Sequence, residues 1–283
     1  MKHIIITGII LLSLFSFSFA QVGTMQDDTI VNYIDINKKK QGKWIKYYDN
    51  GSIRYKGFFI NDIPTGTFMY YYSNGNIKSV MNYDDDGYST TEMYWKNKNK
   101  AAKGYYNPER QRIKTWHIYY EDGSLASVIN YDMQGAADGE VKMYYPGTNQ
   151  LVLHCFYENG KKHGHYIKYF DSGLVHEEGD YKNGLKVGIW KLYSPEGDLE
   201  EEGPFVDGIR NGDWIVYMDD PKGDTVNYTH GRPDNYDEQM ELWRKKEEWA
   251  REHQDQFRQP EDYLDNPIEF FKPSNVNNPY GNW

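Results

Sequence analysis

The chain has 283 residues and carries 42 acidic against 32 basic side chains, a formal net charge of −10. An acidic surface repels phosphate backbones and anionic lipids, so we expect no nucleic-acid partner and no electrostatic binding to membranes. The single cysteine, Cys155, excludes an internal disulfide, and an aromatic content of 17% with 27 tyrosines favours β-structure over a helical bundle.

Residues 1–20 are typical of a secretory signal peptide. Lys2 precedes an uncharged apolar run, and Ser18-Phe19-Ala20 forms a small-x-small cleavage site before Gln21. The run is about 16 residues long and a membrane span needs about 20, which favours cleavage over a transmembrane anchor. Gln21 stands where a bacterial lipoprotein would have cysteine. We therefore expect export to the periplasm, the cell surface or the medium.

Residues 21–41 predict a short N-terminal cap segment. A strand over Thr29 to Ile36 would cover the open edge of the repeats that follow. Exposed strand edges invite aggregation, and repeat arrays therefore need caps.

Residues 42–231 contain an internal repeat of 24 or 25 residues. Its anchor positions are mostly glycine: Gly42, Gly66, Thr90, Lys114, Gly139, Gly164, Gly188 and Gly212. The residue five past each anchor is always aromatic: Tyr47, Tyr71, Trp95, Tyr119, Tyr144, Tyr169, Tyr193 and Tyr217. The residue two past it is aromatic in six units: Trp44, Phe68, Trp116, Tyr166, Trp190 and Trp214. Agreement in several columns at once indicates a structural repeat.

Turn signals divide each unit into two strands. Pairs such as Asn50-Gly51 lie about nine residues past the anchor, and pairs such as Asn183-Gly184 lie four before it. Glycine after asparagine or aspartate supplies the positive φ that a tight hairpin turn needs. Each unit therefore predicts one β-hairpin, and eight hairpins in series predict an elongated single-layer sheet of about 75 Å.

Alternation along the strands places aromatic residues on both faces of this sheet. Residues two and four past the anchor point to one face, as in Trp190 with Leu192, and residues three and five past it point to the other. A lone hairpin cannot bury its apolar side, so the units have to stack.

The pattern G-x-W-x-x-Y-Y followed by N-G resembles the MORN repeat, in the variant found in tandem in bacterial proteins. Many of those proteins are labelled as antitoxin components of toxin–antitoxin systems. The best units are GKWIKYYDNGSIRYKGFF, GHYIKYFDSGLVHEEGDYKNG and GIWKLYSPEGDLEEEGPFVDG. The resemblance implies a repeat scaffold and carries over no catalytic residues. The stretch STTEMYWKNKNKAAKGYYNPERQRIKTW lacks both anchor glycines, so we expect distortion in units three and four.

The C-terminal flank has a different character. Residues 232–259 predict a helix of about 22 residues, with Tyr236, Met240, Trp243 and Phe257 on one face. The helix either packs on the last hairpins as a cap or binds a partner or a second copy. Residues 260–283 predict an irregular tail rich in proline and asparagine.

The sequence shows no catalytic constellation, and we expect no enzyme activity, no metal and no cofactor. His163 and His165 flank a glycine and lack further ligands at metal-binding spacing. Asp84-Asp85-Asp86 lacks the spaced acids of a calcium loop and predicts a solvated turn. Cys155 neighbours Phe156 in a predicted strand, which favours a buried thiol over a nucleophile.

Two functions of different classes remain from the sequence. The favoured one is a non-catalytic scaffold that binds a protein partner in the cell envelope. The alternative is a glycan-binding or cell-wall-binding module in which aromatic rows stack on sugar rings. That alternative requires solvent-exposed rings six residues past the anchors, at Tyr48, Tyr72, Tyr120 and Tyr145. A structural alternative to both functions is that the same aromatic residues pack in the core.

Overall fold

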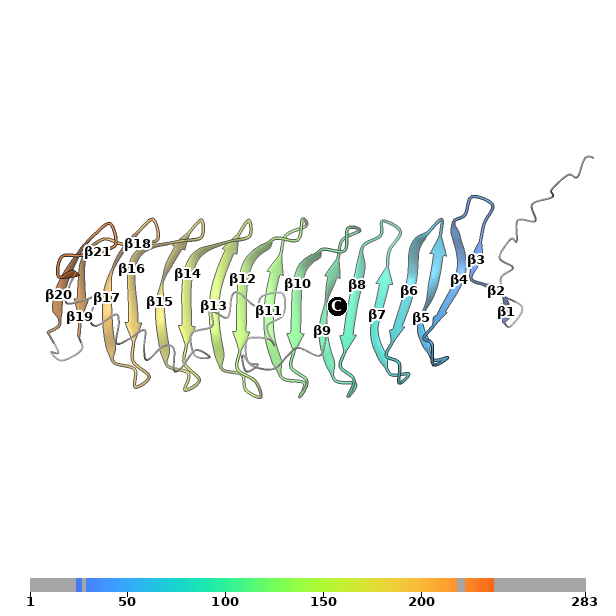
Figure 1. Ribbon diagram of the computed structural model, residues 1–283, viewed down its shortest axis with the longest axis horizontal. Coiled ribbons are helices and arrows are strands. Elements are labelled where there is room, and N and C mark those ends of the chain that lie inside the picture. The colour runs from blue at the N-terminus through green and yellow to red at the C-terminus, as the bar shows by residue number, and fades with distance from the viewer. Residues whose placement is uncertain (1–23, 27–28, 218–221, 237–283) are drawn as a thin grey trace, which may run out of the picture.

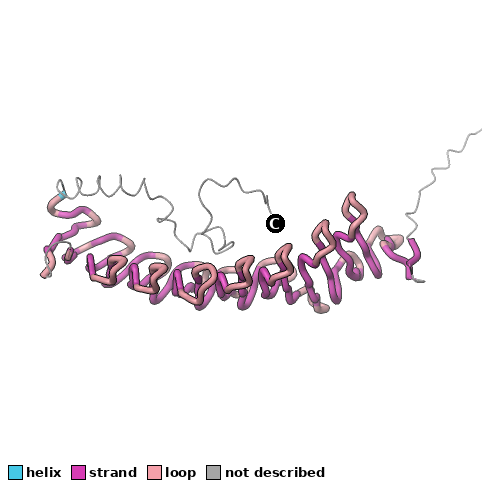
Figure 2. The backbone as a smooth tube through the Cα atoms, turned by 90° about the horizontal axis from the view of Figure 1, so that it is seen from below, coloured by secondary structure: helices cyan, strands magenta, loops and turns pink. Residues whose placement is uncertain are grey.

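The computed structural model describes residues 24–26, 29–217 and 222–236 (Figure 1). The signal peptide predicted over 1–20, most of the helix predicted over 232–259 and the tail over 260–283 lie outside these residues. Every element that the structure describes is a strand, and all 21 strands join in one sheet. The views in Figures 1 and 2 show one long, curved layer of strands lying side by side.

The strands follow one another along the rod in chain order. They are β1 (Thr24–Gln26), β2 (Thr29–Val31), β3 (Tyr33–Ile34), β4 (Lys40–Tyr47), β5 (Ile53–Ile60), β6 (Ile63–Tyr71), β7 (Ile77–Tyr83), β8 (Ser89–Tyr94), β9 (Lys100–Tyr106), β10 (Arg112–Tyr119), β11 (Leu125–Tyr131), β12 (Ala137–Tyr144), β13 (Leu151–Glu158), β14 (Lys161–Tyr169), β15 (Val175–Lys182), β16 (Leu185–Tyr193), β17 (Leu199–Val206), β18 (Ile209–Arg210), β19 (Gly212–Val216), β20 (Asp224–Thr229) and β21 (Arg232–Pro233).

The predicted stack of eight hairpins is confirmed. The hairpins are β4–β5, β6–β7, β8–β9, β10–β11, β12–β13, β14–β15, β16–β17 and β19–β20, and each pairs antiparallel with the next. At the joints between units, Asn159, Asn183 and Asp207 have positive φ and precede a glycine that also has positive φ. This is the backbone of the tight turn that the Asn-Gly and Asp-Gly pairs predicted.

The anchor glycines are β-bulge residues. Gly42, Gly66, Gly164, Gly188 and Gly212 all have φ between 63° and 93°. Where one unit pairs with the next, the register of the strand pairing shifts beside the anchor glycine. An example is the shift between Glu178 and Asp180, where β15 pairs with β16. A bulge adds one unpaired residue and bends the strand, and glycine adopts the required positive φ without strain.

Unit three departs from the predicted register. The pairing of β7 with β8 runs one to one without a bulge, and Ser89 pairs with Tyr106 as Gly188 pairs with Phe205. Ser89 is therefore the structural anchor in place of Thr90. The prediction that Trp95 stands five past the anchor is wrong for this reason, and Tyr94 occupies that place. The hairpin itself is intact. The connection from β7 to β8 is one residue shorter than the repeat predicts, and this shortening removes the bulge.

Unit four keeps the bulge without its glycine. Lys114 has a φ of 58°, which L-residues with a Cβ rarely adopt. The register between β9 and β10 shifts from Ile113 to His117 around it. Neighbouring strands hold this backbone conformation, so the expected distortion is confined to the anchor residue.

Two short strands cover the N-terminal edge of the array. Val31 in β2 pairs parallel with Lys43 of β4, and β3 pairs antiparallel with the start of the same strand. Asn32, with a φ of 59°, separates β2 from β3 and accepts a 2.8 Å hydrogen bond from the Ile45 amide through Oδ1. The single strand predicted over Thr29 to Ile36 is therefore broken at Asn32, but it lies on the edge where a cap was expected.

The buried core is a row of side chains along one face, which we call the core face. Cross-strand pairing connects this central row from unit to unit: Trp44, Gly57, Phe68, Met81, Thr91, Gly104, Trp116, Ile129, Val141, Cys155, Tyr166, Gly179, Trp190, Gly203, Trp214 and Val226. The opposite side of the sheet is the open face, which carries the residues three and five past each anchor.

Four large rings of the central row lie over a glycine of the preceding strand: Phe68, Trp116, Trp190 and Trp214. A Cβ added to Gly179 would stand 2.4 Å from the Trp190 ring, and one added to Gly203 would stand 2.4 Å from Trp214. The indole Nε1 of each of these three tryptophans donates to the carbonyl of the residue after that glycine, at 3.0 Å for Trp116, 3.2 Å for Trp190 and 3.0 Å for Trp214. In the middle of the rod, aliphatic residues such as Ile129 and Val141 fill the row instead.

Candidate functional site

Aromatic rings and cations alternate along the core face. Tyr181, Trp190, Phe205 and Trp214 form successive edge-to-face contacts, with ring centroids 5.2, 5.9 and 5.3 Å apart. The Nζ of Lys186 lies 3.6 Å from the centroid of Trp190. Such contacts attract a cation to the ring face and are strongest where water is excluded.

The cations form a column two residues before the anchors, which the sequence analysis missed. Its members are Lys40, Arg112, Lys162, Lys186 and Arg210, each over the ring two past its own anchor. Two of them also make ion pairs, Lys186 with Glu177 at 3.0 Å and Arg210 with Glu201 at 2.6 Å. The signal that could have revealed this column is the recurrence of a basic residue two positions before five of the eight anchors.

The residues six past the anchors form a hydrogen-bonded ladder along one edge of the sheet. The hydroxyl of Tyr48 donates to the Tyr71 carbonyl at 2.7 Å, and the hydroxyl of Tyr72 donates to the Tyr94 carbonyl at 2.8 Å. The same bond recurs one unit further on each time, from Trp95 to Tyr119, Tyr120 to Tyr144 and Tyr145 to Tyr169, at 3.1, 2.7 and 3.0 Å. Each of the first five units is thus hydrogen-bonded to the carbonyl that ends the first strand of the next unit.

The ladder does not match the exposed aromatic row that glycan binding requires. Tyr120 is only 6% exposed, and Tyr48, Tyr72 and Tyr145 are half-buried. Burial raises the pKa of Tyr120 far above its usual value and that of Tyr145 to about 12. The predicted binding surface is therefore wrong for Tyr120, and the hydroxyls of all four tyrosines are used within the sheet.

Removing one ladder hydroxyl should weaken the joint between two units. We expect Tyr120→Phe to lower the free energy of unfolding by about 1 kcal/mol, because the ring still packs while the Tyr144 carbonyl loses its donor. Urea denaturation followed by circular dichroism measures this change. Tyr47→Phe is the matched control, since Tyr47 is 48% exposed and its replacement should leave the midpoint unchanged. Equal effects of the two changes would contradict a role for the ladder.

Several tyrosines should make the fold sensitive to alkaline pH. The pKa of Tyr83 and of Tyr145 rises from 10.0 to about 12 through burial, and that of Tyr94 to about 12 mainly through its bond to Glu92. A pKa that is higher in the folded state stabilises the fold below pH 10, and that contribution is lost as pH rises from 10 toward 12. The urea midpoint should fall across this interval. Tyr145→Phe should reduce the fall, and an unchanged midpoint would contradict it.

On the open face, the tyrosines five past the anchors bond to glutamates. Tyr193 donates to Glu178 at 2.7 Å and Tyr217 donates to Glu202 at 2.9 Å. Lys191 lies 3.7 Å from Glu202 in the same region. This face is partly exposed and polar along its middle, in contrast to the core face.

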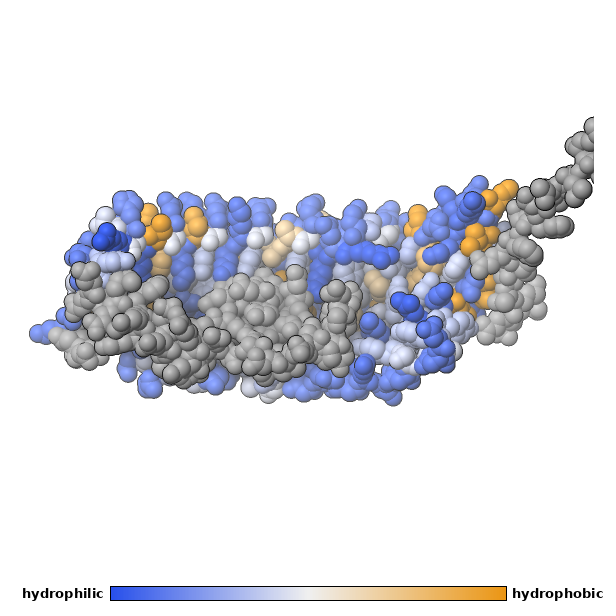
Figure 3. Space-filling view, in the orientation of Figure 1, coloured by the Kyte–Doolittle hydropathy of each residue, from blue (hydrophilic) through white to orange (hydrophobic). Residues whose placement is uncertain are grey.

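Two apolar patches lie on the open face beside the turns that join the units. The first patch is Phe58, Ile60 and Ile63, where Ile60 pairs with Ile63 across the turn. The second patch is Leu185, Ile189, Val206 and Ile209, where Val206 pairs with Ile209. Ile60 is 58% exposed and Ile189 is 55% exposed. Hydrophobic colouring gathers along this edge toward both ends of the rod in Figure 3.

The residues considered for metal binding have ordinary partners. His163 lies 3.1 Å from Glu158, and His165 lies 3.3 Å from Asp180, so the two imidazoles contact different acids. Asp84 accepts backbone hydrogen bonds from Asp86 and Tyr88 within its turn. Across residues 24–26, 29–217 and 222–236, no three histidine, cysteine, aspartate or glutamate side chains gather as a metal site.

Cys155 lies on the core face, as expected for a buried thiol. It occupies the place in the central row that glycine holds in other units, opposite Tyr166. The smaller ring of Tyr166, compared with tryptophan, leaves room for the thiol at this position.

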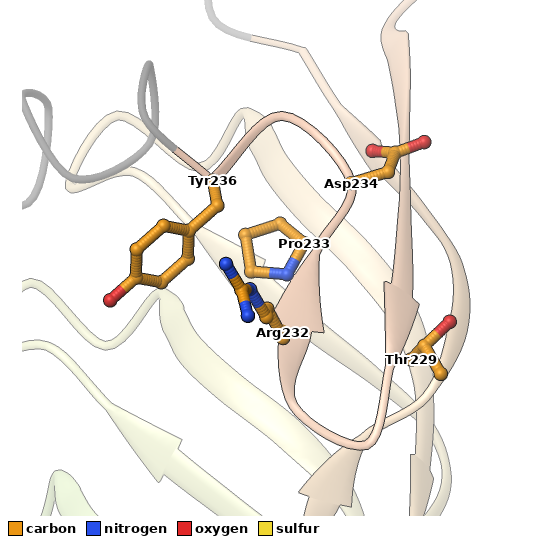
Figure 4. A pocket seen from close by; sticks show the side chains of 5 residues that line it. All are labelled: Thr229, Arg232, Pro233, Asp234 and Tyr236. Atoms are coloured by element: carbon orange, nitrogen blue, oxygen red, sulfur yellow. The ribbon is translucent and has the colours of Figure 1, made fainter.

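An open depression lies at the C-terminal end of the sheet (Figure 4). Thr229, Arg232, Pro233, Asp234 and Tyr236 line it. The guanidinium of Arg232 lies 4.6 Å from the Tyr236 ring centroid, while the Asp234 carboxylate points away from both. No nucleophile and general base meet among these five residues.

Within residues 24–26, 29–217 and 222–236, no helix is long and apolar enough to cross a membrane.

Comparison with known proteins identifies the repeat. The profile of the family described as MORN repeat variant matches residues 40–61, 64–85 and 186–207. These matches cover the first two hairpins and the β16–β17 hairpin, each of which has an anchor glycine with positive φ. A search of the curated proteins found no match to the chain. The repeat columns, the hairpin stack and the profile agree that these parts of the chain are MORN repeats of the variant class.

Proposed function

We propose that the chain is an exported, non-catalytic scaffold that binds a protein partner in the cell envelope through its open face. The observation that carries the proposal is the pair of apolar patches on that face, at Phe58–Ile60–Ile63 and at Leu185–Ile189–Val206–Ile209. Apolar side chains gathered inside a polar surround are typical of sites that bind proteins.

The spacing of the patches suits an extended partner or a partner with two contact points. The patches lie on β5–β6 and on β16–β18, eleven strands apart between β5 and β16. At about 4.8 Å per strand, this is roughly 50 Å along the rod. Two contacts held at a fixed distance bind more tightly than either alone, provided that the partner spans the gap.

Export is supported by the sequence of residues 1–20, whose charge, apolar run and cleavage site are those of a signal peptide. A periplasmic or extracellular location leaves a cytosolic antitoxin target out of reach. The non-catalytic character is supported by the family, since repeat scaffolds present surfaces, and by the separate partners of His163, His165 and Asp84.

Glycan binding is not the function that the geometry favours. Its sugar-stacking row would be the six-past residues, and their hydroxyls are bonded to backbone carbonyls one unit away. A tyrosine that stacks on sugar needs a free ring face, and Tyr120 lacks one at 6% exposure.

The experiment is affinity capture of envelope proteins by the mature chain and by patch variants. Ile189→Ser with Val206→Ser removes the second patch, and Phe58→Ser with Ile60→Ser removes the first. Leu174→Ser with Ile77→Ser is the matched control, because both residues are exposed and apolar but lie outside the patches. A partner retained by the control and lost with either patch variant supports the proposal. A partner retained by both patch variants, or repeated recovery of no protein, contradicts it.

A further inference from the structure

The turns that close the hairpins line one edge of the sheet, which we call the hairpin edge. Turns 1 to 7, in chain order, are residues 48–52, 72–76, 95–99, 120–124, 145–150, 170–174 and 194–198. They lie in a nearly straight line along the lower edge in Figure 1. Because each hairpin adds two strands, successive turns are about 9.6 Å apart.

Charge divides sharply along the hairpin edge. Within two residues of turns 1 to 3 there are six basic residues and one acidic residue, a net charge of +5. Within two residues of turns 4 to 7 there are six acidic residues and one basic residue, a net charge of −5. All six acids and four of the six cations are exposed. The basic half consists of Lys46, Arg54, Lys78, Lys96, Lys98 and Lys100, and the acidic half consists of Glu121, Asp122, Asp171, Glu196, Asp198 and Glu200.

The opposite edge, which carries the turns between units, shows no such division. Acidic and basic residues are mixed there in both halves of the rod. Glu109 neighbours Arg110 in one half, and Asp207 lies close to Arg210 in the other. The separation of charge is therefore a property of the hairpin edge, and it gives that edge a direction that a second charged surface can recognise.

We propose that the hairpin edge is the contact between two copies of the chain, which lie antiparallel so that the basic half of each meets the acidic half of the other. A two-fold rotation about the normal of the sheet produces this arrangement, because it reverses the rod and brings one hairpin edge against the other. The rotation leaves the bow of the rod, visible in Figure 2, on the same side in both copies. The two edges therefore meet along their whole length.

One register matches all seven described turns, and its two-fold axis lies between turns 4 and 5. Turn 3 then faces turn 6, which carries Asp171. Turn 3 has Lys96 and Lys98 at its tip, together with Lys100, which also pairs with Glu92 at 2.8 Å. Turn 2 faces the acidic turn 7, and the acidic turn 4 faces turn 5, which has no charged residue within two positions. No two of these turns meet with like charge.

The contact has the size of a stable dimer interface. An edge about 75 Å long and about 10 Å wide buries roughly 1,500 Å² on the two copies together, within the usual range for protein complexes. A single exposed ion pair contributes little, so the affinity has to come from many pairs along the edge. Such pairs are screened by salt, and the dimer should therefore dissociate as ionic strength rises.

This inference goes beyond the proposed partner and does not depend on it. The two apolar patches lie on the open face beside the opposite edge, next to the turns that join the units. A dimer formed through the hairpin edge leaves both patches accessible and presents two copies of each.

Sedimentation velocity of the mature chain tests the dimer. A dimer should form at about 20 mM salt and dissociate at about 0.5 M. Lys96→Glu with Lys98→Glu should raise the dissociation constant at least about tenfold, because turn 3 then faces Asp171 with like charge. Asp171→Lys should have a similar effect. Lys38→Glu with Lys39→Glu is the matched control, because both residues are exposed on the opposite edge and Lys38 shares the positive φ of Lys98.

Mixing the two defective variants separates charge matching from misfolding. The chain with Lys96→Glu and Lys98→Glu is complementary to the chain with Asp171→Lys, so an equimolar mixture should dimerise although neither variant does alone. A folding defect is not repaired by mixing. A wild-type chain that stays monomeric at low salt, a mixture that stays monomeric, or a control that fails like the two variants would overturn the proposal. A monomer that instead binds polyphosphate through Lys96 and Lys98 would assign the basic half to a polyanion and would also overturn it.

Carbodiimide cross-linking of the wild-type dimer tests the register. Lys78 beside turn 2 should link to Glu196 or Asp198 in turn 7. Within one chain these turns are ten strands apart, about 48 Å, and carbodiimide adds no spacer, so such a link has to join two chains. Links between chains from Lys78 or Lys98 to acids of the opposite edge, such as Asp84, would overturn the proposal.

Discussion

Trp190→Ala is expected to lower the free energy of unfolding by about 3–5 kcal/mol. The ring is fully buried, meets Tyr181 and Phe205 edge to face, lies under Lys186 and covers Gly179. Its neighbours cannot fill the space, because Gly179 and Gly203 on the flanking strands have no side chains. The cavity therefore remains, and the loss of buried area adds to its cost. Urea denaturation followed by circular dichroism measures the effect.

Trp44→Ala is the matched control for this substitution. Trp44 stands in the same repeat column and pairs with Gly57 as Trp190 pairs with Gly203, but it is only half-buried. We expect a loss of about 1–2 kcal/mol, because less apolar surface is removed from a covered site. If both substitutions lower the free energy of unfolding equally, the difference in burial between Trp190 and Trp44 does not determine how much each contributes to stability.

Gly179→Ala is expected to destabilise the sheet by about 1–3 kcal/mol through steric overlap. The new Cβ would stand 2.4 Å from Cδ2 and Cε2 of Trp190, and the rigid indole has to move. Backbone conformation plays no part here, since Gly179 is absent from the residues with positive φ. The midpoint of urea unfolding reports the change.

Gly188→Ala separates the two roles of glycine in this chain. Its Cβ would meet nothing within 4 Å, but its φ is 67°. The cost is therefore conformational only, about 1–2 kcal/mol. The destabilising effects of Gly179→Ala and Gly188→Ala should differ once the Trp190 ring is removed. In a Trp190→Ala background Gly179→Ala should become nearly neutral, while Gly188→Ala should keep its cost. Additive effects of Gly179→Ala and Trp190→Ala would contradict the steric explanation.

Some features of the site needed the register between strands before they could be found. Glycine recurs late in four units, at Gly57, Gly104, Gly179 and Gly203. Glycine is needed there because an aromatic ring of the next strand lies over each of these positions. Tyr48, Tyr72, Tyr120 and Tyr145 were visible as a column, but sequence spacing does not show that their hydroxyls reach a carbonyl one unit away. Contacts between units depend on bulges that shift the pairing by a residue or more.

Unit three shows the limit of counting along the chain. A period of 24 or 25 placed the anchor at Thr90, whereas pairing places it at Ser89. The error moved Trp95 into the wrong column and hid Tyr94. A bulge residue has no side-chain partner, so its loss leaves no mark in composition and appears only where two strands pair.

The sequence by itself determined the hairpins, their number and their stacking into one rod, together with the resemblance to the MORN repeat. These follow from local physics, because alternation fixes the strands and glycine after asparagine or aspartate fixes the turns. Only the tertiary structure decided which face is buried and what the aromatic columns do. Both faces of the sheet carry aromatic rings. Which face is buried depends on the glycines, cations and carbonyls that neighbouring units contribute. Such contacts join residues about one repeat apart, and their energy is set by packing, which a single strand does not specify.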